Sequence, residues 1–122
     1  NNRYKTLPGS AFDVDFGSDY DLVLVPNFIH HFDAATNEKL FRKVHAALKP
    51  GGKVAVAEFV VDDDRVSPPA AAMFNLVMLV GTPHGDAFTY REIESMLHNS
   101  GFKSVSAHPT ANIDQQVIVG VK

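Results

Sequence analysis

Two short apolar runs, separated by a segment with helical periodicity, constrain the fold of this chain more than any other feature of its sequence. Residues 21–25 and 53–57 are rich in β-branched and aliphatic side chains, and a Lys-Pro-Gly-Gly turn at residues 49–52 precedes the second run. A strand, a helix and a second strand in this order indicate two parallel neighbours in one sheet. The sequence therefore predicts an α/β fold.

A histidine and a glutamate lie at the carboxyl ends of the two predicted strands. His30 follows the first run, and Glu58 ends the second. The carboxyl ends of parallel strands meet at one edge, which is where open α/β sheets bind their ligands. A histidine and a carboxylate that meet there indicate a general base and the group that orients it.

Both residues also allow a purely structural interpretation. His30 can bond to local backbone at the start of a helix, and Glu58 can cap a helix or accept from amides at the end of its strand. The functional interpretation is favoured because strand alternation places Glu58 on the same face as Val54 and Val56. A carboxylate buried in an apolar strand needs a partner.

The composition excludes several classes of protein. The chain has 122 residues and is 45% hydrophobic, enough for one domain with its own core. A formal net charge of −3 gives no basic footprint for nucleic acid, and no apolar run approaches the ~20 residues of a membrane span. The lack of cysteine excludes disulfides and fits a cytoplasmic protein. His31 and Asp33, beside His30, lack the spacing of a closed zinc site, so no metal is expected.

Three helices are predicted from spacing and capping signals. The first covers residues 34–48, with Asp33 as its N-cap. The second begins at residues 67–69, and its apolar body over residues 70–80 forms either a core or subunit contact or the wall of an apolar pocket. The third opens with a capping box at residues 89–92 and ends at residues 100–101. The buried stripe of the first helix comprises Leu40, Phe41, Val44 and Leu48.

Further strands are predicted at residues 3–7, 104–108 and 115–121, and the second of the two apolar runs is predicted to continue as a strand over residues 54–61. The run over residues 54–61 is apolar on both faces, as expected for a strand covered by helices on both sides. The acidic residues 62–64 that follow predict a solvated loop. Because the chain enters its first predicted strand with no preceding helix or start methionine, we expect it to be part of a longer protein.

The segments at residues 21–33 and 47–58 resemble the second half of class I S-adenosylmethionine-dependent methyltransferases. The resemblance extends over nearly the whole chain and is greatest to small-molecule O-methyltransferases of the plant caffeate and antibiotic-biosynthesis type. It implies a Rossmann-like sheet, mostly parallel with an antiparallel C-terminal strand, whose N-terminal cofactor-binding half is missing. Residues 1–122 would then form the C-terminal part of a single catalytic domain.

The resemblance also implies a cofactor, S-adenosylmethionine, with S-adenosylhomocysteine as its product, and roles for individual residues. In this family the histidine that matches His30 removes the acceptor's hydroxyl proton, and the carboxylate that matches Glu58 holds the imidazole. A turn beside the adenine and a loop lining the cofactor cleft match the cofactor-binding positions Gly9, Ser10, Ala11, Phe12, Pro26 and Asn27. The acceptor-binding positions are Phe28, Met78 and Thr82.

Three residues depart from the family pattern. Ser10 replaces an aspartate, and Pro26 stands where a lysine or polar residue is common. Ala87 takes the place of a second glutamate that flanks the histidine, a role for which Asp86 is the neighbouring candidate. Decay of this kind is also expected of a non-catalytic methyltransferase-like assembly module, an alternative that retention of His30 and Glu58 disfavours. An oxidoreductase or hydrolase fragment is a further alternative that rests on shared architecture alone.

The family's glycine-rich first motif, its ribose-binding acidic residue and its helical dimerisation domain would all precede this chain. We therefore expect the complete protein to be a homodimer that binds a small-molecule acceptor, and the isolated chain to bind cofactor weakly. Without the upstream strands, the strand at residues 21–26 would become a bare apolar edge, which tends to associate with other chains.

Overall fold

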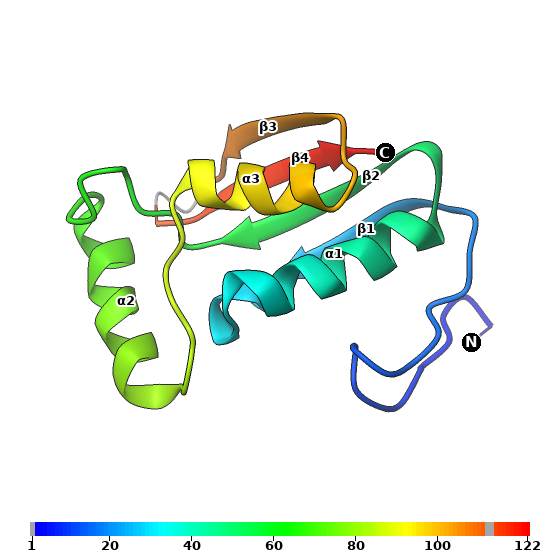
Figure 1. The fold of residues 1–122 in the computed structure, drawn as a ribbon, viewed down its shortest axis with the longest axis horizontal. Helices are drawn as coiled ribbons and strands as arrows, with labels where there is room; N and C mark the ends of the chain where they lie inside the picture. The colour runs from blue at the N-terminus through cyan, green and yellow to red at the C-terminus, as the bar shows by residue number, and fades with distance from the viewer. Residues whose placement is uncertain (1, 112–113) are drawn as a thin grey trace.

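The fold is a four-stranded sheet with helices on one face, seen in a computed structural model that describes residues 2–111 and 114–122. The strand order is β1-β2-β4-β3 (Figure 1). β1 and β2 are parallel, whereas β4 is antiparallel to both of its neighbours, β2 and β3. This arrangement confirms the α/β fold and the parallel pair expected from the two apolar runs. The strands are β1 (Tyr20–Pro26), β2 (Leu48–Glu58), β3 (Ser104–Pro109) and β4 (Gln116–Val121).

The connection between β1 and β2 consists of a short 3-10 helix, η1 (Ile29–His31), and helix α1 (Ala34–Ala47). Asp33 is the N-cap of α1, as predicted, because its side chain accepts a hydrogen bond from the Thr36 amide at 2.8 Å. The helix ends one residue earlier than predicted, since Leu48 has extended backbone and begins β2. The predicted turn at residues 49–52 is therefore the irregular start of β2, where the register against β1 shifts.

Two further helices follow, α2 (Pro69–Gly81) and α3 (Tyr90–Asn99). The capping box of α3 is confirmed, because Thr89 and Glu92 exchange side chain-to-backbone hydrogen bonds. α1 and α3 lie side by side over the sheet, whereas α2 stands beyond the carboxyl end of β2 (Figure 1). The core between the two helices and the sheet is continuous, and its members include Leu40, Phe41, Val44, Val54, Val56, Ile93, Met96, Leu97 and Ile118.

The prediction that β2 is covered on both faces is wrong for the described residues. Val54 and Val56 are fully buried under α1 and α3, but Ala55 and Ala57 on the opposite face are only half-buried. The strand also ends at Glu58 rather than at residue 61. Its ladder stops there because the next amide, that of Phe59, turns back to the Glu58 carboxylate at 3.2 Å.

The predicted strand at residues 3–7 is also wrong. These residues are exposed and belong to no strand, and β1 pairs only with β2. One edge of β1 is consequently open, with Leu22 52% and Leu24 67% exposed. An apolar groove of about 480 Å³ runs along β1 between this edge, the N-terminal segment and α1. None of the described helices combines the length and apolarity needed to cross a membrane.

Candidate active site

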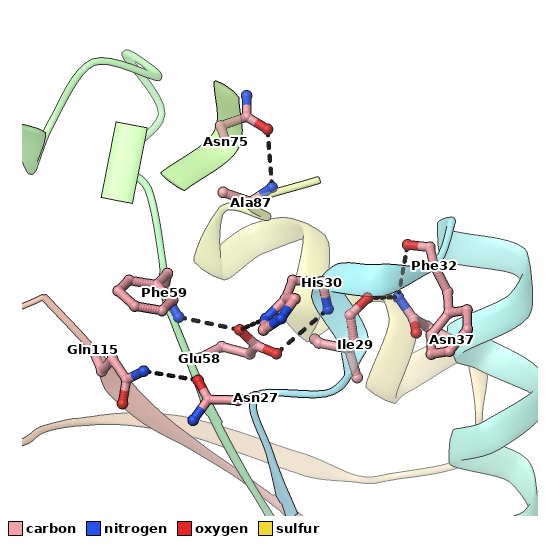
Figure 2. Close-up of polar contacts among 10 residues, drawn as sticks. All are labelled: Asn27, Ile29, His30, Phe32, Asn37, Glu58, Phe59, Asn75, Ala87 and Gln115. Carbon is pink, nitrogen blue, oxygen red and sulfur yellow. Dashed lines mark hydrogen bonds and ion pairs between the residues drawn. The ribbon is translucent and has the colours of Figure 1, made fainter. Parts of the chain in front are cut away.

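His30 and Glu58 meet at the carboxyl edge of the sheet, as their positions in the sequence predicted. The imidazole Nδ1 lies 2.7 Å from Glu58 Oε2, and the other carboxylate oxygen accepts from the His30 backbone amide at 3.4 Å (Figure 2). Both residues are buried, with 6% of His30 and 1% of Glu58 exposed. The fold thus joins a group from η1 and a group from β2, the elements on either side of α1 in the chain, into one hydrogen-bonded unit.

The bond to Glu58 decides which nitrogen of the His30 ring is available for chemistry. In the neutral ring, a carboxylate at Nδ1 selects the tautomer that carries its proton there and leaves the Nε2 lone pair free. Glu58 also accepts from the Phe59 amide, so the carboxylate has three hydrogen bonds that offset its loss of water. An imidazole oriented in this way can act as a general base.

An aromatic wall stands against the His30 ring. Phe74 of α2 meets the imidazole edge-on with ring centroids 4.8 Å apart, and Phe59 stacks on Phe74 at 4.2 Å. Sequence reasoning placed Phe74 in a helix that either packs in a core or lines a pocket, but did not single it out. The exposed ring of His31 lies on another side, 4.4 Å from that of His30.

The loop after α2 touches the same turn. The Asp86 amide donates to the His30 carbonyl at 3.0 Å. Gly85 is required for this approach, because a Cβ there would collide with both the His30 carbonyl and the Thr82 hydroxyl. Thr82, a predicted acceptor-binding residue, already uses that hydroxyl within the loop. It donates to the Met78 carbonyl at 2.8 Å and accepts from the Gly85 amide at 2.7 Å.

Ala87, at the place of the second family glutamate, and its neighbour Asp86 differ from each other in their surroundings. Ala87 is fully buried, and its amide donates to Asn75 Oδ1 at 3.1 Å. Burial raises the pKa of the Asp86 carboxyl, which lies within electrostatic range of Arg65 and Glu92. Asn75 was missed by sequence reasoning, although it is the one polar side chain in the body of an apolar helix and so required a partner.

The predicted cofactor turn is a compact loop beside α1. The Ser10 hydroxyl accepts from the Phe12 amide at 3.2 Å, and Gly9 has a φ of +133°, where a Cβ would strike the Val14 side chain. Phe12 contacts Phe28, with ring centroids 6.3 Å apart. Phe28, predicted to bind the acceptor, is therefore brought to the cofactor turn rather than to the His30 ring.

Asn27 turns the chain out of β1 toward His30. It has a φ of +49°, a left-handed conformation that asparagine tolerates better than most residues. Its amide donates to the Ala57 carbonyl at 2.8 Å, and its side-chain oxygen accepts from Gln115 Nε2, also at 2.8 Å. Gln115 was not predicted as a site residue. Pro26, the last residue of β1, is exposed at this edge.

The described residues fit one wall of an S-adenosylmethionine site. The small turn at residues 9–12 and the Phe12 ring suit a flat purine. The groove along β1 does not fit the cofactor's ammonium and carboxylate groups, since no charged side chain lines it. Within residues 2–111 and 114–122, no group of three or more His, Asp or Glu side chains is arranged to hold a metal ion.

The sheet order, the β1–α1–β2 unit and the histidine–carboxylate pair at its carboxyl edge match the fold of S-adenosylmethionine-dependent methyltransferases. A family profile described as the O-methyltransferase domain matches residues 1–103, and the chain belongs to this family. The family uses S-adenosylmethionine, as solved complexes of its members with this cofactor or with S-adenosylhomocysteine show.

Several relatives are similar over nearly the whole chain. The 3-hydroxy-5-methyl-1-naphthoate 3-O-methyltransferase of Streptomyces sahachiroi is 35% identical over 98% of this chain and 35% of its own length. A crystal structure from Nostoc punctiforme PCC 73102, assigned as an O-methyltransferase, is 56% identical with a TM-score of 0.95 over 98% of this chain and 37% of that one. Human N-acetylserotonin methyltransferase in complex with S-adenosylmethionine is 26% identical with a TM-score of 0.87, over 95% of this chain and 33% of that one. The chain thus spans about a third of the length of the relatives it matches.

Proposed function

We propose that residues 1–122 form the C-terminal part of a catalytic domain that transfers a methyl group from S-adenosylmethionine to a hydroxyl oxygen of a small molecule. The buried contact of 2.7 Å between His30 Nδ1 and Glu58 Oε2 carries this proposal. An exposed histidine–carboxylate pair contributes little to stability and would not by itself indicate a function. A buried pair at the ligand-binding edge of an α/β sheet favours catalysis.

In the proposed reaction, His30 Nε2 accepts the proton of the acceptor hydroxyl as its oxygen attacks the methyl carbon. Glu58 keeps the ring in the required tautomer and stabilises the imidazolium that forms. When bound, S-adenosylmethionine supplies a methyl group that is already electrophilic, so the protein's main task is to align it with the acceptor. General-base assistance contributes roughly 10²–10⁴-fold.

Two groups of residues around the His30 turn would hold the two ligands. The turn at residues 9–12, with Pro26 and Asn27, would hold the cofactor, and Phe28, which packs against Phe12, would lie with this group. Met78 and Thr82 would line the acceptor site, to which we add Phe74 because its ring contacts the His30 imidazole. Stacked Phe59 and Phe74 suit a flat aromatic acceptor. The hydroxynaphthoate named for the Streptomyces sahachiroi relative is an acceptor of this kind.

We further propose that an upstream half of the catalytic domain completes the protein. The exposed leucines of β1 and the apolar groove beside it are surfaces that such a half would cover. The complete protein would act in the cytoplasm as a homodimer, with its dimer contacts in the upstream region.

The test is His30→Gln in the catalytic domain extended to the length of its relatives. The assay measures S-adenosylhomocysteine released with 3-hydroxy-5-methyl-1-naphthoate and with N-acetylserotonin as acceptors. We expect kcat to fall by about 10²–10⁴-fold, while calorimetry shows unchanged S-adenosylhomocysteine affinity and no binding of NAD.

His108→Gln is the matched control, because His108 is an exposed histidine on β3, far along the chain from the site. It should leave kcat unchanged. Wild-type kcat in His30→Gln would contradict the general-base role and leave alignment alone as the source of catalysis. Stabilisation by neither S-adenosylhomocysteine nor NAD would favour an assembly module.

A further inference from the structure

The turn that carries His30 is held by its backbone as well as by its ring. The Glu58 carboxylate accepts from the His30 amide, and the Asp86 amide donates to the His30 carbonyl. Both polar backbone groups of the base are thus bonded to elements distant in sequence, β2 and the loop before α3. With these two backbone bonds in place, the turn that carries His30 can still shift relative to α1.

Asn37 connects the turn to α1 and so restricts that shift. It lies in the first turns of α1, is fully buried, and points its amide at η1 (Figure 2). Its Nδ2 donates to the Ile29 carbonyl at 2.9 Å and to the Phe32 carbonyl at 3.4 Å. The Ile29 carbonyl precedes His30 in the sequence and the Phe32 carbonyl follows it. The Asn37 side chain is therefore bonded to the turn on both sides of His30.

An asparagine is a poor choice for this place if the place serves packing alone. Residue 37 occupies the buried stripe of α1, three, four and seven residues before Leu40, Phe41 and Val44. Its Oδ1 is buried and has no hydrogen-bond partner among the described residues. An apolar side chain would fill the stripe without burying an unpaired oxygen. What asparagine adds is the pair of N–H donors aimed at the base-bearing turn.

We propose that Asn37 is a positioning residue for His30, which sets the height of the imidazole over the acceptor site by fixing η1 to α1. The proposal rests on the proposed function and deepens it. Glu58 determines how the ring is rotated, whereas Asn37 determines where the backbone that carries the ring lies. Because the reacting nitrogen must sit within hydrogen-bond reach of the acceptor oxygen, a shift of about 1 Å in the turn can lower the rate by about 10²-fold.

The experiment is a double-mutant cycle in the extended catalytic domain, with the acceptors named above. Asn37→Ala removes both donors, and Asn37→Ser keeps one hydroxyl donor on a shorter arm. The matched control is Asn99→Ala, because exposed Asn99 also donates from Nδ2 on a helix, to partly exposed Glu38 at 3.0 Å. Each variant is made with His30 intact and with His30→Gln, and all are assayed below their unfolding temperatures.

We expect Asn37→Ala to lower kcat by about 10–100-fold with little change in the KM for S-adenosylmethionine. Asn37→Ser should lose less, and Asn99→Ala should lose nothing. In the His30→Gln background the loss caused by Asn37→Ala should disappear, because the misplaced group is already gone. If Asn37→Ala does not fold, the same comparison is made with Asn37→Ser.

A second readout does not depend on turnover. In protein labelled with ¹⁵N-histidine, the His30 ring signals, assigned through His30→Gln, report its tautomer and mobility. We expect Asn37→Ala to broaden or split these signals and Asn99→Ala to leave them unchanged.

Two results would overturn the role of Asn37 alone. These are a kcat within twofold of wild type together with unchanged ring signals, or an equal loss of kcat in both His30 backgrounds, which indicates general destabilisation. Wild-type kcat in His30→Gln itself would instead refute the general-base role of His30, and the role of Asn37 with it.

Discussion

The two edges of the sheet differ in how they meet solvent. β3 has the features of a permanent edge: it is short, carries the polar side chains of Ser106 and His108, and ends in Pro109. β1 also ends in a proline, Pro26, but its Leu22 and Leu24 side chains are exposed beside an apolar groove. The comparison shows that the β1 edge exposes large apolar side chains, whereas the β3 edge exposes mainly small and polar ones.

The same contrast divides the proposed active site. On the β2 side, the His30 turn is bonded through its ring and backbone to Glu58, Asn37 and the Asp86 amide. On the β1 side, the turn at residues 9–12 is held by a hydrogen bond within the turn, by Lys43, and by the contacts of Phe12 with Phe28 and Phe32. We therefore propose that this chain holds the part of the site that handles the proton, whereas an upstream half completes the part that binds the cofactor.

The largest expected effect tests the β1 edge. Leu24→Lys in the isolated chain should change the free energy of unfolding by no more than about 0.5 kcal/mol, because the side chain is exposed there. In the extended domain, where we propose that the upstream half covers β1, the same change should cost about 2–4 kcal/mol by burying an unpaired charge. Urea unfolding of both proteins measures the difference.

Ser106→Lys on β3 is the control for that prediction, since this edge is expected to remain exposed in both proteins. Its effect should be small in each. Equal effects of Leu24→Lys in the two proteins would mean that nothing covers β1, and the distinction between the edges would fail.

An intermediate effect is expected for the lysine that holds the cofactor turn. Lys43 Nζ donates to the carbonyls of Ala11 and Val14 at 2.9 and 2.8 Å and lies 4.6 Å from the Phe16 ring centroid. Lys43→Met removes these charge-assisted bonds and should cost about 1–2 kcal/mol. Hydrogen exchange should accelerate at the amides of residues 11–16 but not at His30.

Lys39→Met serves as the control, because this lysine is on the exposed face of the same helix. Acceleration at His30 that equals the acceleration in the turn would show that the two halves of the site unfold as one unit.

The smallest expected effect concerns the charge of the Asp86 carboxyl, in the loop that contacts the His30 turn. Burial raises the pKa of the Asp86 carboxyl, so the folded state disfavours its ionised form. The penalty is present at pH values above that raised pKa and absent where the carboxyl is protonated in both states. Asp86→Asn should therefore stabilise the protein slightly at pH 7, by no more than about 0.5 kcal/mol, and the gain should vanish near pH 3.

Asp64→Asn provides the opposite sign. Hydrogen bonds from the Val66 and Ser67 amides lower the pKa of the Asp64 carboxyl, so its ionised form stabilises the fold at neutral pH. That variant should lose stability at pH 7 and approach wild type in acid. Thermal unfolding across pH 3–8 distinguishes the two variants. A loss of stability in Asp86→Asn at pH 7 would contradict the prediction that burial disfavours the ionised Asp86 carboxyl.

Local patterns were sufficient to predict most of the elements and the central pair. The N-cap at Asp33 and the capping box at Thr89 depend on side chains a few residues apart, so the sequence specifies them directly. The meeting of His30 and Glu58 followed from the topology of two parallel strands, which places their carboxyl ends together.

The errors arose where a residue's state depends on a distant partner. Residues 3–7 have strand composition but no strand beside them, and β2 has an apolar second face that no described helix covers. Asn37 and Phe74 were missed because only the tertiary structure shows that they touch the His30 turn. A signal was present for Asn37, since a polar residue on a buried helical stripe demands an explanation.

The absence of a side chain at Gly85 limits how the loop beside His30 can be redesigned. The loop reaches the His30 carbonyl only because residue 85 has no Cβ, and its neighbour Thr82 uses its hydroxyl to hold the loop in place. Substitutions in this loop would therefore disturb the turn that carries His30. Under the proposed function, libraries aimed at new acceptors should instead vary Phe74 and Met78 on α2, because the bonds that hold the turn's backbone come from other residues.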